Sequence, residues 1–422
     1  MTDDTGILTS PHTALRVGGW LPTDPGAIRA YVADLIAEVE AHPTALLPPV
    51  QEFADVIDQN SIIRFLAEQM IKQVPAKYKT NPAGGAQIQS ISQMLALINA
   101  VIQQPPPYND TALVGFPINA ILDWSMGTPA GSAFFRLEPV NAALKGILQY
   151  WCEYLKSPES LAAFEPDSWG SPDALKKINI EQYKHRPGPP PWGFASWNNF
   201  FIREFNKGER EVAGRGDPSV IVSACESTPF AIQKNVKRED TFWIKAQPYS
   251  LEEMLAGQHV DEFVGGTVYQ AFLNAFNYHR WHSPVSGKIV SASVRDGSYY
   301  AEAPSEGFDP GGPNLSQGFI AHVATRAIIF IQADNPAIGL VAVIPIGMSE
   351  VSSNILQLEN GAPLEPGVHV DKGDQLGYFQ FGGSTHCLVF RPGVIDSFDV
   401  HTIPGPNAQV IKLKSKIATA RS

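Results

Sequence analysis

One serine in this chain follows two glycines at the end of an apolar alternating run, in FQFGGST at residues 379–385. Glycine adopts backbone angles that other residues avoid, and Gly383 carries no Cβ to shield its carbonyl carbon from attack. The Ser384 hydroxyl is therefore next to a peptide bond on which it can act as a nucleophile. The same residues also fit a simpler interpretation, in which a strand ends in a Gly-Gly-Ser-Thr turn.

Two histidines lie three residues apart in YHRWHSP, residues 278–284. A histidine can take the proton of a serine hydroxyl, provided that a third group holds its ring in the correct tautomer. His279 and His282 also have the spacing of two metal ligands, or of two surface histidines. No third and fourth ligand lies nearby in the sequence, and the turn residues that follow favour a strand end. A catalytic pair is therefore the preferred interpretation.

Three blocks of this sequence, in this order, resemble the phosphatidylserine decarboxylase family. They are FASWNNFFIREF at 194–205, the histidine block at 278–284, and a final block that runs from KGD at 372–374 through GYF at 377–379 to FGGST at 381–385. Members of this family are pyruvoyl enzymes that cut themselves before a serine. The resemblance therefore implies self-cleavage between Gly383 and Ser384.

The resemblance also implies a role for each site residue. His282 is expected to be the base that activates Ser384, and His279 to lie beside the finished active site and donate a proton later, since histidine titrates near working pH. Relatives orient the base with an aspartate in a block of the SAADSR type. Here SACES at 223–227 has Glu226 at that position. Glu226 is thus the expected orienting carboxylate, with a solvated glutamate in a turn as the alternative.

The cofactor that the resemblance implies is a covalently bound pyruvoyl (pyruvate) group made from Ser384. Attack of its hydroxyl on the Gly383 carbonyl forms an ester, and elimination with hydrolysis leaves residue 383 as a carboxylate and a pyruvoyl group at 384. The ketone of that group joins a substrate amine and withdraws electrons, so that an α-carboxylate leaves as carbon dioxide. Gly382 and Thr385 are expected to support the turn, Thr385 by binding the oxyanion or holding the backbone. His386 is a candidate substrate contact, and no metal is implied.

Composition describes a globular chain that carries negative charge. Of its 422 residues 44% are hydrophobic and 17% charged, and the net charge is −11, which disfavours nucleic acid and anionic lipid as partners. The N-terminus lacks the features of a secretory signal, and the longest apolar runs, 327–331 and 340–346, are too short to span a bilayer. Three distant cysteines, an odd number, indicate neither a disulfide framework nor a structural zinc site. We expect a cytoplasmic protein without a membrane anchor, whose two cleaved chains stay associated and which is compatible with a monomer.

The fold class follows from a change of pattern near residue 190. Apolar residues recur at helical spacing in 28–39, 50–74, 88–102 and 140–155, which predicts a helical domain over 1–185, with the aromatic residues 151–154 in its core. A proline-rich stretch at 186–193 predicts a linker. Short β-rich runs punctuated by glycine and proline then predict a mostly antiparallel decarboxylase domain over 194–422. The chain is therefore predicted to be an α+β protein.

Three functions remain open at this point. Residues 282–289 and 367–374 are similar to phrases of lipoyl and biotinyl barrels, so a carrier or binding module competes, although no lysine stands clearly at a hairpin tip between them. Within the family, PVQEF at 49–53, PYND at 107–110 and GSAF at 131–134 resemble the extension of members that decarboxylate free L-tryptophan. We therefore expect a free aromatic amino acid, L-tryptophan giving tryptamine, as the substrate. Phosphatidylserine, giving phosphatidylethanolamine, is the alternative, which an acidic chain without an anchor disfavours.

Overall fold

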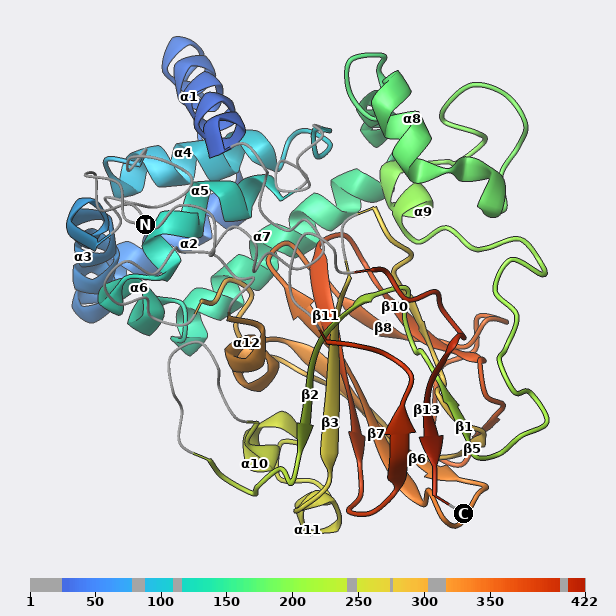
Figure 1. The fold of residues 1–422 in the computed structure, drawn as a ribbon. Helices are drawn as coiled ribbons and strands as arrows, with labels where there is room; N and C mark the ends of the chain where they lie inside the picture. The colour runs from blue at the N-terminus through green and yellow to red at the C-terminus, as the bar shows by residue number, and fades with distance from the viewer. Residues whose placement is uncertain are drawn as a thin grey trace, which may run out of the picture.

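The structure is a computed structural model that describes residues 25–77, 88–108, 116–240, 249–273, 276–302, 316–402 and 409–421. The protein is an α+β protein, as predicted from its sequence. A group of helices comes first in the chain and packs across one end of a set of antiparallel sheets (Figure 1). No helix among these residues is both long enough and apolar enough to cross a membrane.

The helical region confirms the predicted periodicity. Its elements are α1 (Pro25–Ala41), α2 (Pro48–Gln59), α3 (Ser61–Lys77), α4 (Ile91–Val101), α5 (Pro117–Met126), α6 (Pro129–Phe134), α7 (Glu138–Lys156), the 3-10 helix η2 (Pro158–Phe164), α8 (Pro172–Ile178) and the 3-10 helix η3 (Ile180–Gln182). The predicted run over 50–74 is two helices rather than one. The Asn60 side chain accepts hydrogen bonds from the amides of Ile62 and Ile63, at 3.0 and 3.1 Å, and so starts α3 directly after α2.

The described residues of the second half of the chain form three sheets, and every strand pair in them is antiparallel. Its strands are β1 (Val220–Val222), β2 (Thr228–Lys234), β3 (Thr267–Leu273), β4 (Arg280–His282), β5 (Gly287–Arg295), β6 (Arg326–Ala333), β7 (Leu340–Met348), β8 (Asn354–Leu356), β9 (His369–Val370), β10 (Gln375–Phe379), β11 (Gly383–Phe390), β12 (Ile395–Phe398) and β13 (Lys416–Ala420). The large sheet has the order β2-β3-β11-β7-β6-β5-β9, and the small ones β4-β10-β8 and β1-β13-β12. Four short helices accompany them: α9 (Trp197–Phe201), α10 (Leu251–Met254), α11 (Val260–Phe263) and α12 (Gln317–Val323).

Strand β11 lies between β3 and β7 and separates two apolar cores. Cys387 and Val389 pack into the core on the side of α10, α11 and α12. Leu388 and Phe390 pack into the core between the large sheet and the small ones, which also contains Trp281. Because side chains alternate along a strand, Ser384 and His386 lie on the same face of β11 as Leu388 and Phe390.

The helical region and the end of the large sheet share a third core. Phe381, just before the glycine pair, is 2% exposed and belongs to this core together with Trp151, Trp197 and Phe201. Trp151 is buried, as predicted, and its ring lies edge-on to that of Phe381, with centroids 5.2 Å apart. The helices are therefore packed directly against the segment that carries the predicted cleavage site.

The proline-rich segment at 186–193 also packs against this core. The amide of Arg186 donates a hydrogen bond to the carbonyl of Trp192 at 2.8 Å, so the segment closes on itself. The Trp192 ring is buried and stacks on Phe200, with centroids 6.0 Å apart. The segment is thus anchored at its end by an aromatic contact with α9.

Candidate active site

Ser384 occupies the beginning of the central strand. It is the second residue of β11 and lies opposite Gly347 of β7 and Leu273 of β3. Its side chain is fully buried, and its hydroxyl has no hydrogen-bond partner among the described residues. Buried polar groups nearly always have a partner, and exceptions mark strained or reactive positions. An unpaired hydroxyl beside its own preceding carbonyl fits the expected conversion of Ser384 into a pyruvoyl group.

The unusual backbone conformation lies one residue earlier than the sequence suggested. Gly383 is already part of β11 and pairs with Met348. Gly382 instead has a φ of +143°, and a Cβ placed on it would lie 2.1 Å from the amide nitrogen of Val351. Only glycine fits at residue 382, because any side chain there would meet both conformational strain and a backbone clash. The turn that presents the Gly383 carbonyl is therefore fixed by Gly382.

His279 is buried against an aromatic ring that reaches the cleavage segment. It stacks on Phe201 with centroids 4.0 Å apart, and Phe201 in turn contacts Phe381 at 5.3 Å. Neither ring nitrogen makes a hydrogen bond with a described residue. Burial, aided by the charge of Arg203, lowers the pKa of His279 to about 3. His279 is therefore neutral at pH 7 in this state, which differs from the expected histidine that titrates near working pH.

His282 is held at both ring nitrogens. Its Nδ1 donates to the carbonyl of Gly373 at 2.9 Å, since a carbonyl can only accept, and its Nε2 then accepts from the Tyr278 hydroxyl at 3.1 Å. Burial lowers the pKa of His282 to about 3, and the charge of Lys414 adds to this effect. A neutral imidazole with its proton on Nδ1 is the tautomer in which Nε2 can act as a base.

The predicted contact between Glu226 and His282 is not formed among the described residues. The Glu226 carboxylate instead binds Arg210 through two hydrogen bonds, at 2.7 and 3.0 Å, and accepts the amide of Leu413 at 2.7 Å. The physical reason is that the Arg210 guanidinium is buried beside the Phe205 ring, where it needs a counter-charge. The Gly373 carbonyl takes the place that the sequence assigned to Glu226.

Glu226 still lies close to His282 through the backbone. The carbonyl of Ala224, in the same SACES block, accepts the amide of His282 at 2.8 Å. The side-chain amide of Asn277, just before the histidine block, reaches the carbonyl of Glu226 at 3.5 Å. The two sequence blocks are therefore joined through the backbone, and not through the carboxylate that the resemblance assigned to this contact.

The two residues after Ser384 point to opposite faces of β11. The Thr385 hydroxyl donates to the carbonyl of Ala271 at 2.9 Å and also contacts Gln270 and Gln317, which suits a role in holding the backbone rather than in binding an oxyanion. His386 lies on the face of Ser384, is fully buried, and has no hydrogen-bond partner for its ring nitrogens among the described residues. Burial lowers the pKa of His386 to about 4.

Comparison with known proteins places these features in a family. Residues 47–178 and 197–410 match two family models, both described as phosphatidylserine decarboxylase. Decarboxylase iboD of Amanita muscaria is 36% identical over 329 residues, which cover 72% of this chain and 92% of the relative. The L-tryptophan decarboxylase of Psilocybe cyanescens is 32% identical over 417 residues, covering 91% of this chain and 90% of the relative. This chain belongs to the phosphatidylserine decarboxylase family.

The alignment with a lipid enzyme of this family is shorter. Phosphatidylserine decarboxylase proenzyme 3 of Schizosaccharomyces pombe is 31% identical over 246 residues, which are 57% of this chain and 24% of that relative. The relatives that align along most of the chain are decarboxylases. The chain is therefore a decarboxylase of this family, that is, a carboxy-lyase.

Three residues around the family's site were not predicted from the sequence. Tyr278 and Gly373 belong to the YHR and KGD parts of the family-like blocks. The sequence therefore marked both residues, but it did not predict their hydrogen bonds with His282. Arg210 lies outside every block and carries no local signal. It is found only because the fold brings it to Glu226, sixteen residues further along the chain.

The pair of Arg210 and Glu226 gives a stability prediction for this family member. Its side chains are only 6% and 11% exposed, so replacing Arg210 with methionine leaves a buried carboxylate without its partner. We expect Arg210→Met to lower the free energy of unfolding by about 3 kcal/mol, measured by urea denaturation. Arg215→Met, which removes an exposed arginine, is the matched control and should change little. Equal unfolding free energies for wild type and Arg210→Met would show that the pair contributes nothing.

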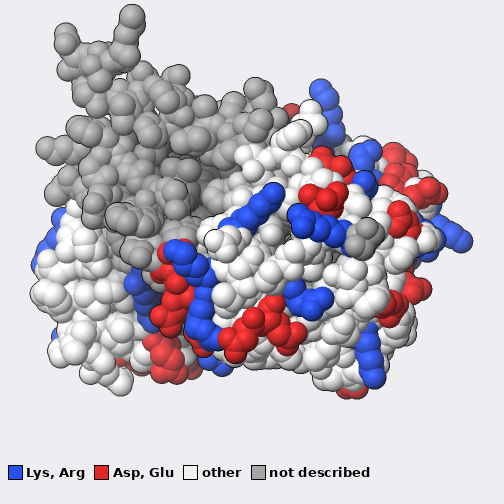
Figure 2. All heavy atoms as spheres, turned by 60° about the horizontal axis from the view of Figure 1, so that its bottom comes forward, with Lys and Arg blue, Asp and Glu red and all other residues white. Residues whose placement is uncertain are grey.

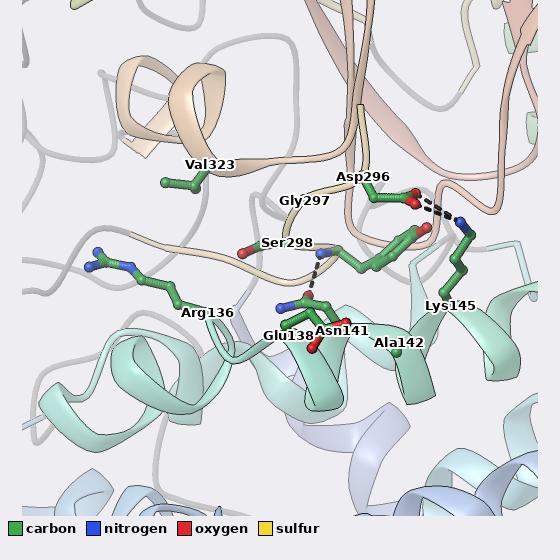
Figure 3. Close-up of a pocket in the computed structure, with 10 residues that line it drawn as sticks. Arg136, Glu138, Asn141, Ala142, Lys145, Asp296, Gly297, Ser298 and Val323 are labelled. Atoms are coloured by element: carbon green, nitrogen blue, oxygen red, sulfur yellow. Dashed lines mark hydrogen bonds and ion pairs between the residues drawn. The ribbon is translucent and has the colours of Figure 1, made fainter. Parts of the chain in front are cut away.

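A pocket of about 540 Å³ lies between the start of α7 and the loop that follows β5 (Figure 3). Lys145 crosses it to form an ion pair with Asp296, with nitrogen to oxygen distances of 2.8 and 2.9 Å. Arg136 and Glu138 line the pocket with no ion pair to another described residue. The described residues that line it do not include Ser384, His279 or His282. Its volume is within the range of small-ligand sites.

Proposed function

We propose that this protein is a self-processing, pyruvoyl-dependent decarboxylase of a free aromatic L-amino acid, with L-tryptophan giving tryptamine as its reaction. The observation that carries the proposal is the similarity to L-tryptophan decarboxylase over 91% of the chain, which includes the helical half. Similarity to the phosphatidylserine enzyme covers 57% of the chain. The unpaired, buried hydroxyl of Ser384 supports self-processing at this serine.

In the proposed self-cleavage, the oxygen of Ser384 bonds to the carbonyl carbon of Gly383, and the C–N bond of that peptide then breaks. His282 is the proposed base, because its neutral ring is fixed in the required tautomer by Gly373. In this structure Nε2 of His282 is hydrogen-bonded to the Tyr278 hydroxyl. To act as the base, it must release that hydroxyl and accept the proton of the Ser384 hydroxyl instead. Gly382 holds the turn, and Thr385 fixes the strand that follows. Glu226 is proposed to act indirectly. Its carboxylate binds Arg210, and the SACES segment that carries it also binds the amide of His282.

The pyruvoyl group, once formed at residue 384, supplies a ketone that withdraws electrons from a bound amino acid. The surroundings of Ser384 can exclude water, because Ser384, His279 and His386 are all fully buried. His279 is proposed to exchange a proton with the substrate, since no side chain is hydrogen-bonded to its ring among the described residues. The aromatic side chains of Phe201 and Phe381 beside it suit an aromatic substrate.

Surface charge supports a small substrate over a lipid in a bilayer. Figure 2, which turns forward the bottom of Figure 1, shows basic and acidic side chains interspersed over the described part of that face rather than gathered into a basic patch. The net charge of the chain is −11. Binding to an anionic membrane gains about 1 kcal/mol for each Lys or Arg near the surface, so a mixed surface gains little.

The deciding experiment compares substrates side by side. Purified protein is incubated with L-tryptophan, L-phenylalanine and L-tyrosine in buffer, and with phosphatidylserine in vesicles and in detergent, and the amine products are measured. We expect tryptamine without detergent, weaker turnover of the other two amino acids, and no lipid product. An indole ring buried against aromatic side chains contributes about 2 kcal/mol of preference over a small side chain.

Two other results would assign the protein to the alternatives. Formation of phosphatidylethanolamine without any tryptamine would place it with the lipid enzymes. A chain that stays intact and turns over nothing would favour a non-catalytic binding module of the lipoyl or biotinyl kind. The variant Ser384→Ala, which cannot form the pyruvoyl group, is the control for background decarboxylation in every assay.

A further inference from the structure

Glu350 is a buried carboxyl residue two positions after the end of β7. It is 1% exposed, and one of its oxygens accepts the amide of Asn119 at 2.7 Å. Its other oxygen has no hydrogen-bond partner among the described residues. The helix α5 begins after Phe116 without any side-chain cap of its own. Glu350 therefore supplies, from a distant part of the chain, the acceptor that the first turn of α5 lacks.

The same stretch of chain, residues 349–352, contacts the turn before the cleavage site. A Cβ on Gly382 would lie 2.4 Å from the carbonyl carbon of Glu350, so the two backbones are in direct contact. The amide of Ser352 donates to the carbonyl of Phe381 at 3.3 Å. Residues 349–352 therefore hold the turn from one side.

Helix α5 holds the turn from the other side. The ring of Phe116, directly before α5, stacks on that of Phe381 with centroids 6.2 Å apart. Two hydrogen bonds tie α5 to residues 349–352: that of Glu350 with the Asn119 amide, and one at 2.8 Å from the Ser349 hydroxyl to the Asn119 side chain. Glu350 thus joins the two supports between which the Phe381-Gly382 segment lies.

We propose that Glu350 is a positioning residue for self-cleavage, which locks α5 onto residues 349–352 so that Gly382 keeps the conformation that presents the Gly383 carbonyl to Ser384. This inference rests on the proposed self-processing function and assigns a task to the helical region. The helices are then required for making the cofactor, and not only for enclosing a substrate. Glu350 acts through the turn and does not itself touch the bond that breaks.

Because Glu350 can ionise, its role can be tested by the pH dependence of cleavage, which a purely structural side chain would not affect. Burial raises the pKa of Glu350 to about 8, against the opposing effect of the backbone amides of Asn119, Glu350 and Ile118. Among the described residues, the titratable groups that face it are the hydroxyls of Tyr31 from α1 and Tyr300 from the chain after β5. Burial raises the pKa of both hydroxyls above its ordinary value, so neither ionises near neutral pH. Glu350 is therefore uncharged at pH 7 and becomes charged as the pH passes 8.

An ionised Glu350 would oppose cleavage. Attack by Ser384 places negative charge on the Gly383 oxygen. The backbone of Glu350 contacts that of the neighbouring Gly382, so a carboxylate charge at residue 350 would raise the energy of the charge on that oxygen. Between the ordinary pKa of 4.5 and about 8, Glu350 is protonated in the folded chain and ionised in the unfolded chain. The contribution of Glu350 to the free energy of unfolding therefore falls as the pH rises through that interval. The loss of stability is therefore complete near pH 8, whereas the charge that opposes the attack develops as the pH passes 8.

The test follows the cleavage of full-length chain made by cell-free translation, sampled over time on denaturing gels at pH 7 and pH 9. We expect Glu350→Ala to cleave at least about 10-fold more slowly than wild type at pH 7, because its clamp is lost. Glu350→Gln keeps an oxygen for the Asn119 amide and cannot ionise, so it should cleave within about twofold of wild type at pH 7. At pH 9 the wild-type rate should fall about 10-fold relative to that of Glu350→Gln. Glu365→Gln, at an exposed glutamate, is the matched control.

Each outcome distinguishes this inference from the proposed function. If wild type does not cleave at either pH, the proposed function fails. If wild type cleaves and Glu350→Ala keeps pace with it, the positioning role is wrong. Should Glu350→Ala fail to fold, as judged by circular dichroism, the ratio of wild type to Glu350→Gln decides: a ratio that does not change between pH 7 and pH 9 overturns the inference.

Discussion

A chain in which alanine replaces Ser384 is expected to remain a single polypeptide, whereas the wild type separates under denaturing conditions into residues 1–383 and 384–422. The effect is complete rather than partial, because alanine has no oxygen with which to attack the Gly383 carbonyl. Mass spectrometry of the denatured protein measures it directly. The small wild-type fragment should begin with a ketone that reacts with hydroxylamine, and should lack a free amine.

The matched control for this experiment is Ser397→Ala, which removes the hydroxyl of an exposed serine in β12 and should still separate into two fragments. A Ser384→Ala chain that is cut at the same place would show that a protease, and not this serine, breaks the bond. A wild-type chain that stays whole while it decarboxylates tryptophan would exclude the pyruvoyl mechanism.

The second large effect concerns the division of work between the two histidines. Replacing His282 with alanine is expected to slow cleavage by at least about 100-fold, since it removes the proposed base. Replacing His279 should leave cleavage largely intact and slow decarboxylation by about 100-fold, since it removes the proposed acid of the later step. Cleavage is followed on denaturing gels, and decarboxylation by tryptamine formed per cleaved chain.

The two histidine variants control for one another. Both residues are buried and both have a pKa lowered to about 3, so the loss of a buried ring is common to the pair. They differ in their contacts, because the ring of His282 is held by Gly373 and Tyr278, whereas the ring of His279 stacks on Phe201. Equal rates of cleavage in the two variants would refute the assignment.

The sequence predicted those parts of the molecule that depend on local patterns. Helical spacing located α1, α4 and α7, and the β-rich run predicted over 368–390 contains β9, β10 and β11. The glycine pair itself led to the proposed cleavage site, because the need for a residue without a side chain is a local property. The structure places that need at Gly382 rather than at Gly383, because a Cβ there would lie 2.1 Å from the amide nitrogen of Val351.

Contacts between distant segments could not be predicted in the same way. The partner of Glu226 depends on where the chain brings Arg210, and the partner of His282 on how the backbone turns at Gly373. The family resemblance supplied residue types at these positions, and one of them, Glu226, is engaged elsewhere because a buried guanidinium competes for it. Nothing in the local sequence pointed to Glu350. Its proposed role depends on a hydrogen bond with Asn119 in α5, a helix that begins more than two hundred residues earlier in the chain.

The position of β11 has a consequence for how the mature protein is assembled. This strand forms ladders with β3 on one side and β7 on the other, and it begins where the proposed cut is made. The smaller product would therefore contribute an interior strand to a sheet whose other strands belong to the larger product. We infer that the two products form an obligate heterodimer in one-to-one ratio, which cannot exchange partners without global unfolding. Folding of the single precursor before cleavage would then be the assembly step. A separately made 384–422 peptide would have to insert β11 between β3 and β7, either after these strands had paired without it or before the sheet had formed.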